Sequence, residues 1–254
     1  MTALLEARNV AKHFGGIQAL KDVSLTIGAG EIYGLIGPNG AGKTTFFNVL
    51  TGLCPKDGGE VRLNGQPLLL SSPHEVARAG VARTFQNIRL FANMTALENV
   101  MVGRHARTRA GVLGAVFRCR RTRAEESDIR RRAHELLDYV GIGDHAQKLA
   151  KNLAYGDQRR LEIARALATE PKLLALDEPA AGMNATETAG LKTLIEGIRA
   201  DGVTVLLIEH DVRLVMGLCD RVAVLDYGEK IAEDVPAAVR KDPKVIEAYL
   251  GSPA

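Results

Sequence analysis

The sequence is poor in aromatic residues and cysteines. Tryptophan is absent from its 254 residues, and aromatic residues make up 4% of them. Surfaces that bind nucleic acid by base stacking need exposed aromatic rings, so the composition does not suggest a nucleic-acid partner. The three cysteines are odd in number and lack metal-ligand spacing, which predicts reduced thiols in a cytosolic protein.

Long hydrophobic runs are also missing. The longest apolar run, residues 203–208, is far too short to cross a bilayer. The N-terminal residues include an acid and no extended apolar stretch, so we expect no signal peptide. The apolar fraction of 46% instead supports one large α/β domain with a substantial core. We therefore expect the chain to reach a membrane only through partner proteins.

A glycine-rich segment, residues 37–44, reads G-x-x-x-x-G-K-T. It follows an apolar run over residues 32–36 that is typical of a buried strand. It leads into residues 43–50, which have a helical pattern. Strand, glycine loop and helix is the context that a phosphate-binding loop requires. The alternative, a glycine-rich turn with a surface lysine, does not predict the flanking strand and helix.

The residues of this loop have the chemistry that phosphate binding needs. Glycines let successive backbone N–H groups curl around phosphate oxygens, and the helix N-terminus adds a partial positive charge. We expect the Lys43 ammonium to reach the β- and γ-phosphates of ATP and the Thr44 hydroxyl to hold Mg²⁺. The predicted nucleotide-binding residues are Gly37, Pro38, Asn39, Gly40, Ala41, Gly42, Lys43, Thr44 and Thr45.

Hydrophobic periodicity predicts an α/β fold, and the glycine loop indicates that it is of the P-loop NTPase type. Residues 4–10 and 23–27 alternate like strands of an antiparallel sheet. In the latter half, predicted strands at residues 173–176, 203–208 and 221–226 alternate with helical patterns. That order predicts a mostly parallel sheet covered by helices.

The middle of the chain differs, because residues 95–152 show no strand pattern. Apolar residues there follow helical spacing, and they are Ile129, Ala133, Leu136, Leu137 and Val140. We therefore divide the single domain into two parts. The nucleotide-binding core comprises residues 1–94 and 154–254, and an inserted helical subdomain comprises residues 95–153.

Two acidic residues, Asp177 and Glu178, end the predicted strand at residues 173–176. The carboxyl edge of a parallel sheet is where α/β proteins bind ligands. At that edge Asp177 would hold Mg²⁺ through water, and Glu178 would act as general base toward the attacking water. A pair of helix-capping acids would give the same local pattern, and the glycine loop is what favours the catalytic interpretation.

Residues 153–167 read L-A-Y-G-D-Q-R-R-L-E-I-A-R-A-L. This segment resembles the signature of ABC transporter ATPases, in which Leu-Ser-Gly-Gly-Gln precedes an Ile-Ala-Arg-Ala-Leu helix. Other family landmarks match in order and spacing. Gln86 looks like the Q-loop glutamine, residues 181–184 like the D-loop and His210 like the switch histidine. Phe14 stands where the family places an aromatic ring that stacks on adenine.

Within this family the chain resembles the ATP-binding subunits of high-affinity branched-chain amino-acid importers. The resemblance rests on residues 154–165, on R-T-F-Q-N-I-R-L-F at residues 83–91, and on A-Y-L-G at residues 248–251. The long helical insertion and the total length also fit. The resemblance covers nearly the whole chain.

In the family, two such subunits sandwich two ATP molecules head to tail, each site combining one subunit's glycine loop with the other's signature. The resemblance implies that Gln86 contacts Mg²⁺ and water and signals to the membrane subunit. It implies that His210 holds the γ-phosphate and the attacking water. The residues that it directs toward the partner's ATP are Ala154, Tyr155, Gly156, Asp157 and Asn184.

The signature departs from the family pattern at three positions. Ala154 replaces the common serine, Tyr155 replaces the first glycine and Asp157 replaces glutamine. One hydroxyl donor to the γ-phosphate is therefore missing. Backbone donors and the helix dipole remain, so we expect the signature to function.

An arginine-rich segment, residues 104–132, carries ten arginines against three acidic residues. Two interpretations are open for it. It is either a solvated helix face or a basic amphipathic helix that meets anionic lipid headgroups. The second interpretation depends on an apolar stripe formed by Val112, Leu113, Val116 and Phe117.

Together these patterns predict an ATP-hydrolysing subunit of an ABC importer, with ATP and Mg²⁺ as cofactors. The implied partners are a second ATP-binding subunit, identical or paralogous, transmembrane permease subunits and, indirectly, a solute-binding protein. We expect the subunit at the cytoplasmic face of the inner membrane, bound peripherally. Because such an ATPase does not touch the cargo, importers of urea, an amide or another small polar solute stay open.

Three other classes fit less well. A soluble ABC ATPase that acts on nucleic acid or ribosomes usually has tandem ATPase domains or a long coiled coil, and neither is present in the sequence. A non-hydrolysing regulatory module would not need Glu178 and His210. Small-molecule kinases share the glycine loop but not the signature.

Overall fold

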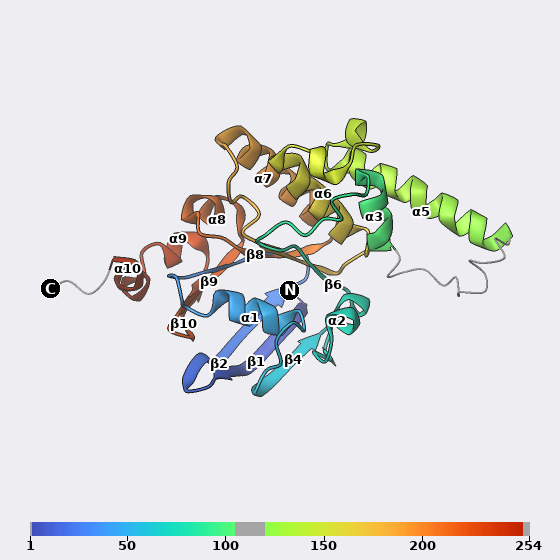
Figure 1. Cartoon of the computed structure of the whole chain (residues 1–254). Coiled ribbons are helices and arrows are strands. Elements are labelled where there is room, and N and C mark those ends of the chain that lie inside the picture. Colours follow the sequence, from blue (N-terminus) through green and yellow to red (C-terminus); the bar gives the residue numbers. More distant parts are fainter. Residues whose placement is uncertain (1, 105–119, 251–254) are drawn as a thin grey trace.

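The structure, a computed structural model, describes residues 2–104 and 120–250, whose strands form two sheets (Figure 1). The four-stranded antiparallel sheet has the order β2-β1-β4-β5. Its strands are β1 (Ala3–Phe14), β2 (Ile17–Gly28), β4 (Gly58–Leu63) and β5 (Gln66–Pro67). The predicted N-terminal antiparallel pair is confirmed as β1 and β2.

The six-stranded sheet has the order β10-β9-β3-β8-β7-β6. Its strands are β3 (Ile32–Ile36), β6 (Val81–Arg83), β7 (Leu173–Asp177), β8 (Thr204–Ile208), β9 (Arg221–Asp226) and β10 (Glu229–Asp234). The strands from β9 to β6 run parallel, and β10 pairs antiparallel with β9. The predicted mostly parallel sheet is therefore confirmed.

The helices lie on both faces of this sheet (Figure 1). They are α1 (Lys43–Leu50), α2 (Pro73–Ala79), α3 (Ala96–Arg104), α5 (Arg120–Tyr139), η2 (Gly143–His145), η3 (Ala150–Asn152), α6 (Tyr155–Leu167), α7 (Ala185–Ala200), α8 (Val212–Leu218), α9 (Pro236–Val239) and α10 (Pro243–Leu250).

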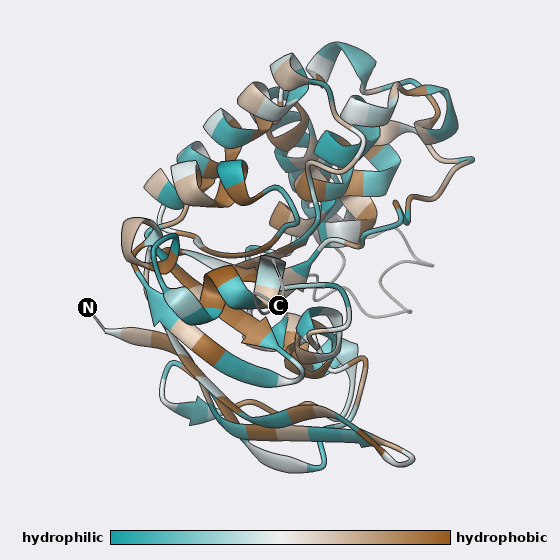
Figure 2. Cartoon of the chain, turned by 90° about the vertical axis from the view of Figure 1, so that its left-hand side faces the viewer, coloured by the Kyte–Doolittle hydropathy of each residue, from teal (hydrophilic) through white to brown (hydrophobic). Residues whose placement is uncertain are grey.

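The central strands are hydrophobic on both faces, and each face has its own core. In β7, Leu174 and Leu176 pack into the core under the helices, whereas Leu173 and Ala175 pack into the core shared with α1. Alternate residues of a strand point to opposite faces, so a sheet covered on both sides needs a continuous apolar run. Figure 2 shows these hydrophobic strands in the interior of the molecule.

Helix α1 lies between the two sheets (Figure 1). Its Phe46 and Phe47 are fully buried in the core that contains residues of both sheets. Burial of one such side chain stabilises the fold by about 1.5–3 kcal/mol. This packing fixes the helix that begins at the glycine loop, so the loop is held between β3 and α1.

A layer of helices α3, α5 and α6 packs on the other side of the large sheet. The stripe predicted for α5 is confirmed, because Ile129, Ala133 and Leu137 are all buried. On its opposite face, Arg131 and Arg132 are exposed and pair with Glu135 at 2.8 and 2.9 Å. No helix in the described residues has the length and hydrophobicity needed to cross a membrane.

Arg123, Arg130, Arg131 and Arg132 of α5 therefore lie on a solvated face, where Arg131 and Arg132 form helical ion pairs. The apolar stripe from Val112 to Phe117 and the neighbouring Arg118 lie outside the described residues. The membrane-contact interpretation of that stripe stays a prediction.

Candidate functional site

A cleft of about 510 Å³ opens above the carboxyl edge of the large sheet. It brings together residues that are far apart in the sequence. Of the predicted site residues, those lining it are Asn39, Gly40, Ala41, Gly42, Lys43, Thr44, Thr45, Gln86, Glu178 and His210. Parallel strands deliver their carboxyl ends to one edge, and the loops after β3, β6, β7 and β8 meet there.

The glycine loop needs glycine at two positions because the chain approaches other backbone closely. Gly37 has φ 151°, and a Cβ there would lie 2.1 Å from the Leu225 carbonyl oxygen. Gly42 has φ 99°, and a Cβ there would lie 2.6 Å from the Ala19 carbonyl oxygen. Both φ values and both contacts exclude larger side chains. The backbone at Leu225 and Ala19 therefore packs against one side of the loop, and residues 39–42 of the loop line the cleft.

Lys43 is nearly buried at the base of this loop. Its Nζ donates to the carbonyl oxygens of Gly37 at 2.6 Å and Pro38 at 2.8 Å. Burial lowers the pKa of the Lys43 ammonium, and the nearby carboxylate of Glu178 opposes that shift. Two carbonyl oxygens of the loop therefore hold the ammonium close to the N-terminus of α1. The first backbone N–H groups of a helix have no partner within the helix.

Glu178 sits at the centre of the cleft with two polar neighbours. Gln86 Nε2 donates to its Oε2 at 2.8 Å, and His210 Nε2 lies 2.5 Å from its Oε1. The backbone of Glu178 is left-handed, with φ 47°, which is uncommon for a residue other than glycine and costs about 1–3 kcal/mol. Its N–H donates to Ile208 O at 2.8 Å, which attaches the strained turn to β8.

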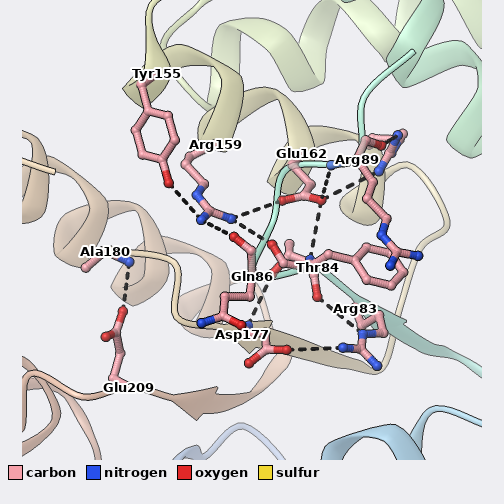
Figure 3. Close-up of polar contacts among 12 residues, drawn as sticks. Arg83, Thr84, Gln86, Arg89, Tyr155, Arg159, Glu162, Asp177, Ala180 and Glu209 are labelled. Atoms are coloured by element: carbon pink, nitrogen blue, oxygen red, sulfur yellow. Dashed lines mark hydrogen bonds and ion pairs between the residues drawn. The ribbon is translucent and has the colours of Figure 1, made fainter. Parts of the chain in front are cut away.

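Asp177, the last residue of β7, is buried and is not among the described residues that line the cleft; Figure 3 shows it beside Arg83. Its carboxylate accepts from Arg83 Nη2 at 3.1 Å, and its N–H donates to Thr84 Oγ1 at 3.3 Å. Burial raises the pKa of the Asp177 carboxyl, whereas the Arg83 charge lowers it. Burial is the larger effect, so the pKa of the Asp177 carboxyl stays above its usual value despite the ion pair with Arg83.

Arg83 is a residue of this site that the sequence analysis did not assign. Besides Asp177, its guanidinium donates to Asn48 Oδ1 at 2.9 Å and Thr51 Oγ1 at 2.8 Å. It also lies 4.5 Å from the ring centre of Phe47. The only local signal was its place at the start of the family-like segment R-T-F-Q-N-I-R-L-F, which does not reveal these partners.

Glu209 connects two loops at the same edge, and the sequence analysis also missed it. It is buried, and its Oε1 accepts from the Ala180 N–H at 2.7 Å (Figure 3). Its other oxygen accepts from the His210 N–H at 3.2 Å. Glu209 thus fastens the segment after Glu178 to the backbone of the predicted switch histidine.

The C-terminal residues contribute to the glycine loop as well. Tyr249, in α10, was noted only as part of a family-like pattern. Burial raises the pKa of its hydroxyl, and a hydrogen bond with the backbone of Gly37 lowers it in part. The last described helix therefore touches the first glycine of the phosphate-binding loop.

Phe14 does not line the cleft in the described part of the chain. It is 52% exposed, and Lys12 Nζ lies 5.3 Å from its ring centre. Ile17 and Tyr227, both highly exposed, do line the cleft. The aromatic ring among the described residues that line the cleft is therefore that of Tyr227, and the adenine-stacking role of Phe14 stays a prediction.

The signature residues Ala154 to Asp157 and Asn184 are not among the described residues that line the cleft. They lie at the starts of α6 and α7, where backbone N–H groups have no partner within the helix. Asn184 caps α7 by accepting from the Glu187 N–H at 3.0 Å. A Cβ on Gly156 would lie 2.9 Å from Glu187 Oε1, so this glycine allows the two segments to touch.

Ala154 is the N-cap of α6, has extended backbone and makes no side-chain cap. We expect Ala154→Ser to raise the free energy of unfolding by about 1 kcal/mol, because a serine hydroxyl accepts a hydrogen bond from the first turn. Urea denaturation measures this change. Ala154→Val, which adds bulk without an acceptor, is the matched control. Equal stability of the serine and valine variants would contradict the prediction.

The glycine loop between β3 and α1, with Glu178 in the same cleft directly after β7, defines a P-loop nucleotide-binding protein. The ABC transporter family model matches residues 20–181. A model described as branched-chain amino acid ATP-binding cassette transporter matches residues 229–254. The chain therefore belongs to the ABC transporter family and is one of its ATP-binding, ATP-hydrolysing proteins.

Several relatives cover almost the whole chain. The high-affinity branched-chain amino acid transport ATP-binding proteins BraF of Pseudomonas aeruginosa and LivG of Escherichia coli K12 are 45% and 46% identical, over 98% of both chains. The lipopolysaccharide export system ATP-binding protein LptB of Escherichia coli K12 is 36% identical over the same share. The higher identity is to the branched-chain amino-acid transport proteins.

Solved structures confirm the fold. The ADP conformation of MJ1267, an ATP-binding cassette of an ABC transporter, has a TM-score of 0.86 at 32% identity and covers 99% of this chain and 100% of its own. A dimeric post-hydrolysis state of the cassette MJ0796, bound to ADP and Pi, has a TM-score of 0.78 at 28% identity, with coverage of 92% and 99%.

Proposed function

We propose that the chain is the ATPase of an importer for branched-chain amino acids and energises separate permease subunits. The observation that carries the chemistry is the cleft, where Lys43 and Thr44 of the glycine loop face Glu178, Gln86 and His210. This arrangement places a phosphate-binding loop opposite a carboxylate that can act on water. The relatives in branched-chain amino-acid transport support the solute class.

In this proposal Lys43 and the N–H groups of the loop bind the β- and γ-phosphates. The Lys43 ammonium exchanges its two carbonyl partners for phosphate oxygens, which are stronger acceptors because they are charged. Glu178 accepts a proton from the attacking water, while Gln86 and His210, both in contact with its carboxylate, orient the water and γ-phosphate.

The residues present fit Mg²⁺. This ion prefers oxygen ligands and is usually held by one or two carboxylates together with substrate phosphates. Thr44 and Gln86, each with a side-chain oxygen, line the cleft, and Asp177 directly precedes Glu178, which also lines it. We propose that Thr44, Gln86 and Asp177 hold Mg²⁺, which neutralises charge on the phosphates when it is bound.

We further propose a head-to-tail dimer with an identical or paralogous subunit. The predicted signature residues and Asn184 lie away from the chain's own cleft, at helix N-termini suited to an anionic group. The dimeric MJ0796 cassette, bound to ADP and Pi, supports such an assembly. In it Ala154, Tyr155, Gly156 and Asp157 would face the partner's ATP.

A second groove is a candidate binding site for the permease. It has a volume of about 360 Å³, lies between α2, α3 and α6, and has the exposed Leu53 and Phe91 on its lining. Phe85, next to Gln86, also lines it. We propose that permease subunits bind here and that the chain is peripheral at the cytoplasmic face of the membrane for that reason. The helical insertion, residues 95–153, would form a subdomain that moves against the core.

Phe14→Ala tests the adenine contact. We expect the affinity for ATP to fall by about tenfold, because stacking on a base is worth roughly 1–3 kcal/mol. The affinity for tripolyphosphate, which has no base, should not change. Tyr227→Ala is the matched variant, and calorimetric titration measures both. A loss in Tyr227→Ala with none in Phe14→Ala would assign the base contact to Tyr227 and contradict the prediction.

Reconstitution tests the solute. The tagged subunit is purified with its permease partners, placed in proteoliposomes and supplied with the solute-binding protein that the permease accepts. We expect leucine to stimulate ATP turnover. Stimulation by urea or an amide alone, with no response to branched-chain amino acids, would replace the proposed solute.

A further inference from the structure

Side chains of α6 form hydrogen bonds to the backbone of residues 85–89, the segment around Gln86 that we call the Q-loop. Arg159 Nη1 donates to the Phe85 carbonyl oxygen at 2.7 Å, and Arg159 Nη2 donates to the Gln86 carbonyl oxygen (Figure 3). Glu162 Oε1 accepts from the N–H groups of Phe85 at 3.3 Å and Arg89 at 3.4 Å. Arginine and glutamate at i and i+3 share one helix face, so the two side chains reach the same segment.

Arg165, three residues further along this face, completes the contact. Its Nη1 donates to the Arg89 carbonyl oxygen, and its guanidinium lies 5.8 Å from the ring centre of Phe91. Arg165, Phe85 and Phe91 all line the groove assigned to the permease. The segment that a permease would contact is thus bonded to α6 from Phe85 to Arg89, and at Phe91 it is also bonded to Asn99 of α3.

The contact is built from deeply buried charges. Arg159 is 3% exposed and Glu162 is 1% exposed. Burial raises the pKa of the Glu162 carboxyl, and the charges of Arg165 and Arg159 oppose that effect. Buried charges are costly unless they are paired and hydrogen-bonded. Hydrogen bonds to the Q-loop backbone compensate Arg159 and Glu162 in part, and Arg159 Nε and Glu162 Oε2 have no hydrogen-bond partner among the described residues. Release of the loop would leave them without those partners.

The same arginine reaches the signature. Arg159 Nη2 donates to the Tyr155 hydroxyl at 2.9 Å, and the guanidinium lies 5.4 Å from the ring centre. The ring also packs on the D-loop, because a Cβ on Gly182 would lie 3.2 Å from Tyr155 Cε1. A glycine in place of Tyr155 could make neither contact.

We propose that Arg159 and Glu162 are positioning residues that join the Q-loop, the signature and the D-loop into one moving unit. A displacement of the Q-loop at the permease groove would then carry the start of α6, and with it the groups that face the partner's ATP. The inference rests on the proposed function, since it assigns the groove to the permease and the signature to the partner subunit. It adds the side chains that transmit the movement.

The first test measures hydrogen exchange in the isolated subunit. In the variant Arg159→Met with Glu162→Met, the Phe85 and Arg89 amides should exchange about tenfold faster or more, since their acceptor is gone. Two apolar side chains of similar length can replace a buried ion pair without loss of folding. The control variant, Arg132→Met with Glu135→Met, removes the exposed pair on α5 and should leave these two amides unchanged.

The second test measures coupling in the reconstituted transporter. The double variant should lose most of the solute stimulation of ATP turnover, by about fivefold or more, while the KM for ATP and the ADP affinity of the isolated subunit change by less than about twofold. A purely structural defect would lower the affinity as well. Arg159→Lys keeps the charge but lacks the planar fork, and should shift exchange and stimulation in the same direction by less.

Unchanged exchange at Phe85 and Arg89 would overturn the proposal, as would full stimulation in a variant whose Q-loop amides exchange faster. If the double variant fails to fold, unchanged exchange in Arg159→Lys decides against it equally. The exchange test needs no permease. If the proposed function is wrong, no solute will stimulate the wild-type transporter. That result is distinguishable from failure of this inference, which the exchange test alone detects.

Discussion

Glu178→Gln is expected to lower ATP turnover by about 100-fold or more while ATP binding persists. Glutamine has the same shape but its amide cannot accept a proton from water. In the structure one oxygen of Glu178 accepts from Gln86 and the other lies beside His210, so a neutral side chain of equal size can remain in place. The variant should therefore bind ATP and fail at the chemical step.

Size-exclusion chromatography and a phosphate-release assay measure both consequences. With ATP, Glu178→Gln should elute as a stable dimer, because the sandwich forms but cannot hydrolyse its nucleotide. Glu209→Gln changes the neighbouring buried acid, which accepts backbone N–H groups, and should reduce turnover far less. Turnover close to the wild-type rate in Glu178→Gln would show that the general-base assignment is wrong.

Lys43→Ala is expected to weaken nucleotide binding by at least about tenfold, or ~1.4 kcal/mol. The ammonium is held by the Gly37 and Pro38 carbonyl oxygens at the base of the glycine loop. Its removal takes away a charge that backbone N–H groups cannot replace. Calorimetric titration with ATP and ADP gives the change directly.

Lys21→Ala is the matched control for Lys43→Ala. Lys21 also lines the cleft, but its side chain is 37% exposed and pairs with Glu229 at 3.0 Å. Such an exposed lysine should contribute little, and we expect its loss to change affinity by less than about twofold. Equal effects of the two substitutions, or an unchanged affinity in Lys43→Ala, would contradict the phosphate-loop assignment.

Local patterns in the sequence were sufficient for several of the elements and for locating the glycine loop. The apolar run before the glycine loop is β3, the helix after it is α1, and the stripe of Ile129, Ala133 and Leu137 is the buried face of α5. These features depend on backbone conformation and on periodicity over a few residues. Both are determined by neighbours in the sequence, so they could be read without a structure.

Partnerships across the fold could not be predicted in this way. Arg83 with Asp177, Glu209 with Ala180, and Arg159 with the Q-loop carbonyls join residues that are tens of positions apart. Each of these side chains looks ordinary in the sequence, because arginine and glutamate are typical of exposed helix and loop positions. Their pairing depends on the strand order of the large sheet and on the packing of α6 against β6.

The sequence by itself therefore determined the class of fold, the glycine loop, the acids after β7 and the family resemblance, because each rests on local spacing. Only the tertiary structure showed that the Glu178 carboxylate contacts Gln86 and His210, and that Arg159 of α6 donates to the Q-loop backbone. It also showed that the signature residues are not among the described residues that line the chain's own cleft. The physical reason is that a buried charge is tolerated only where packing supplies its partner, and packing is set by the whole chain.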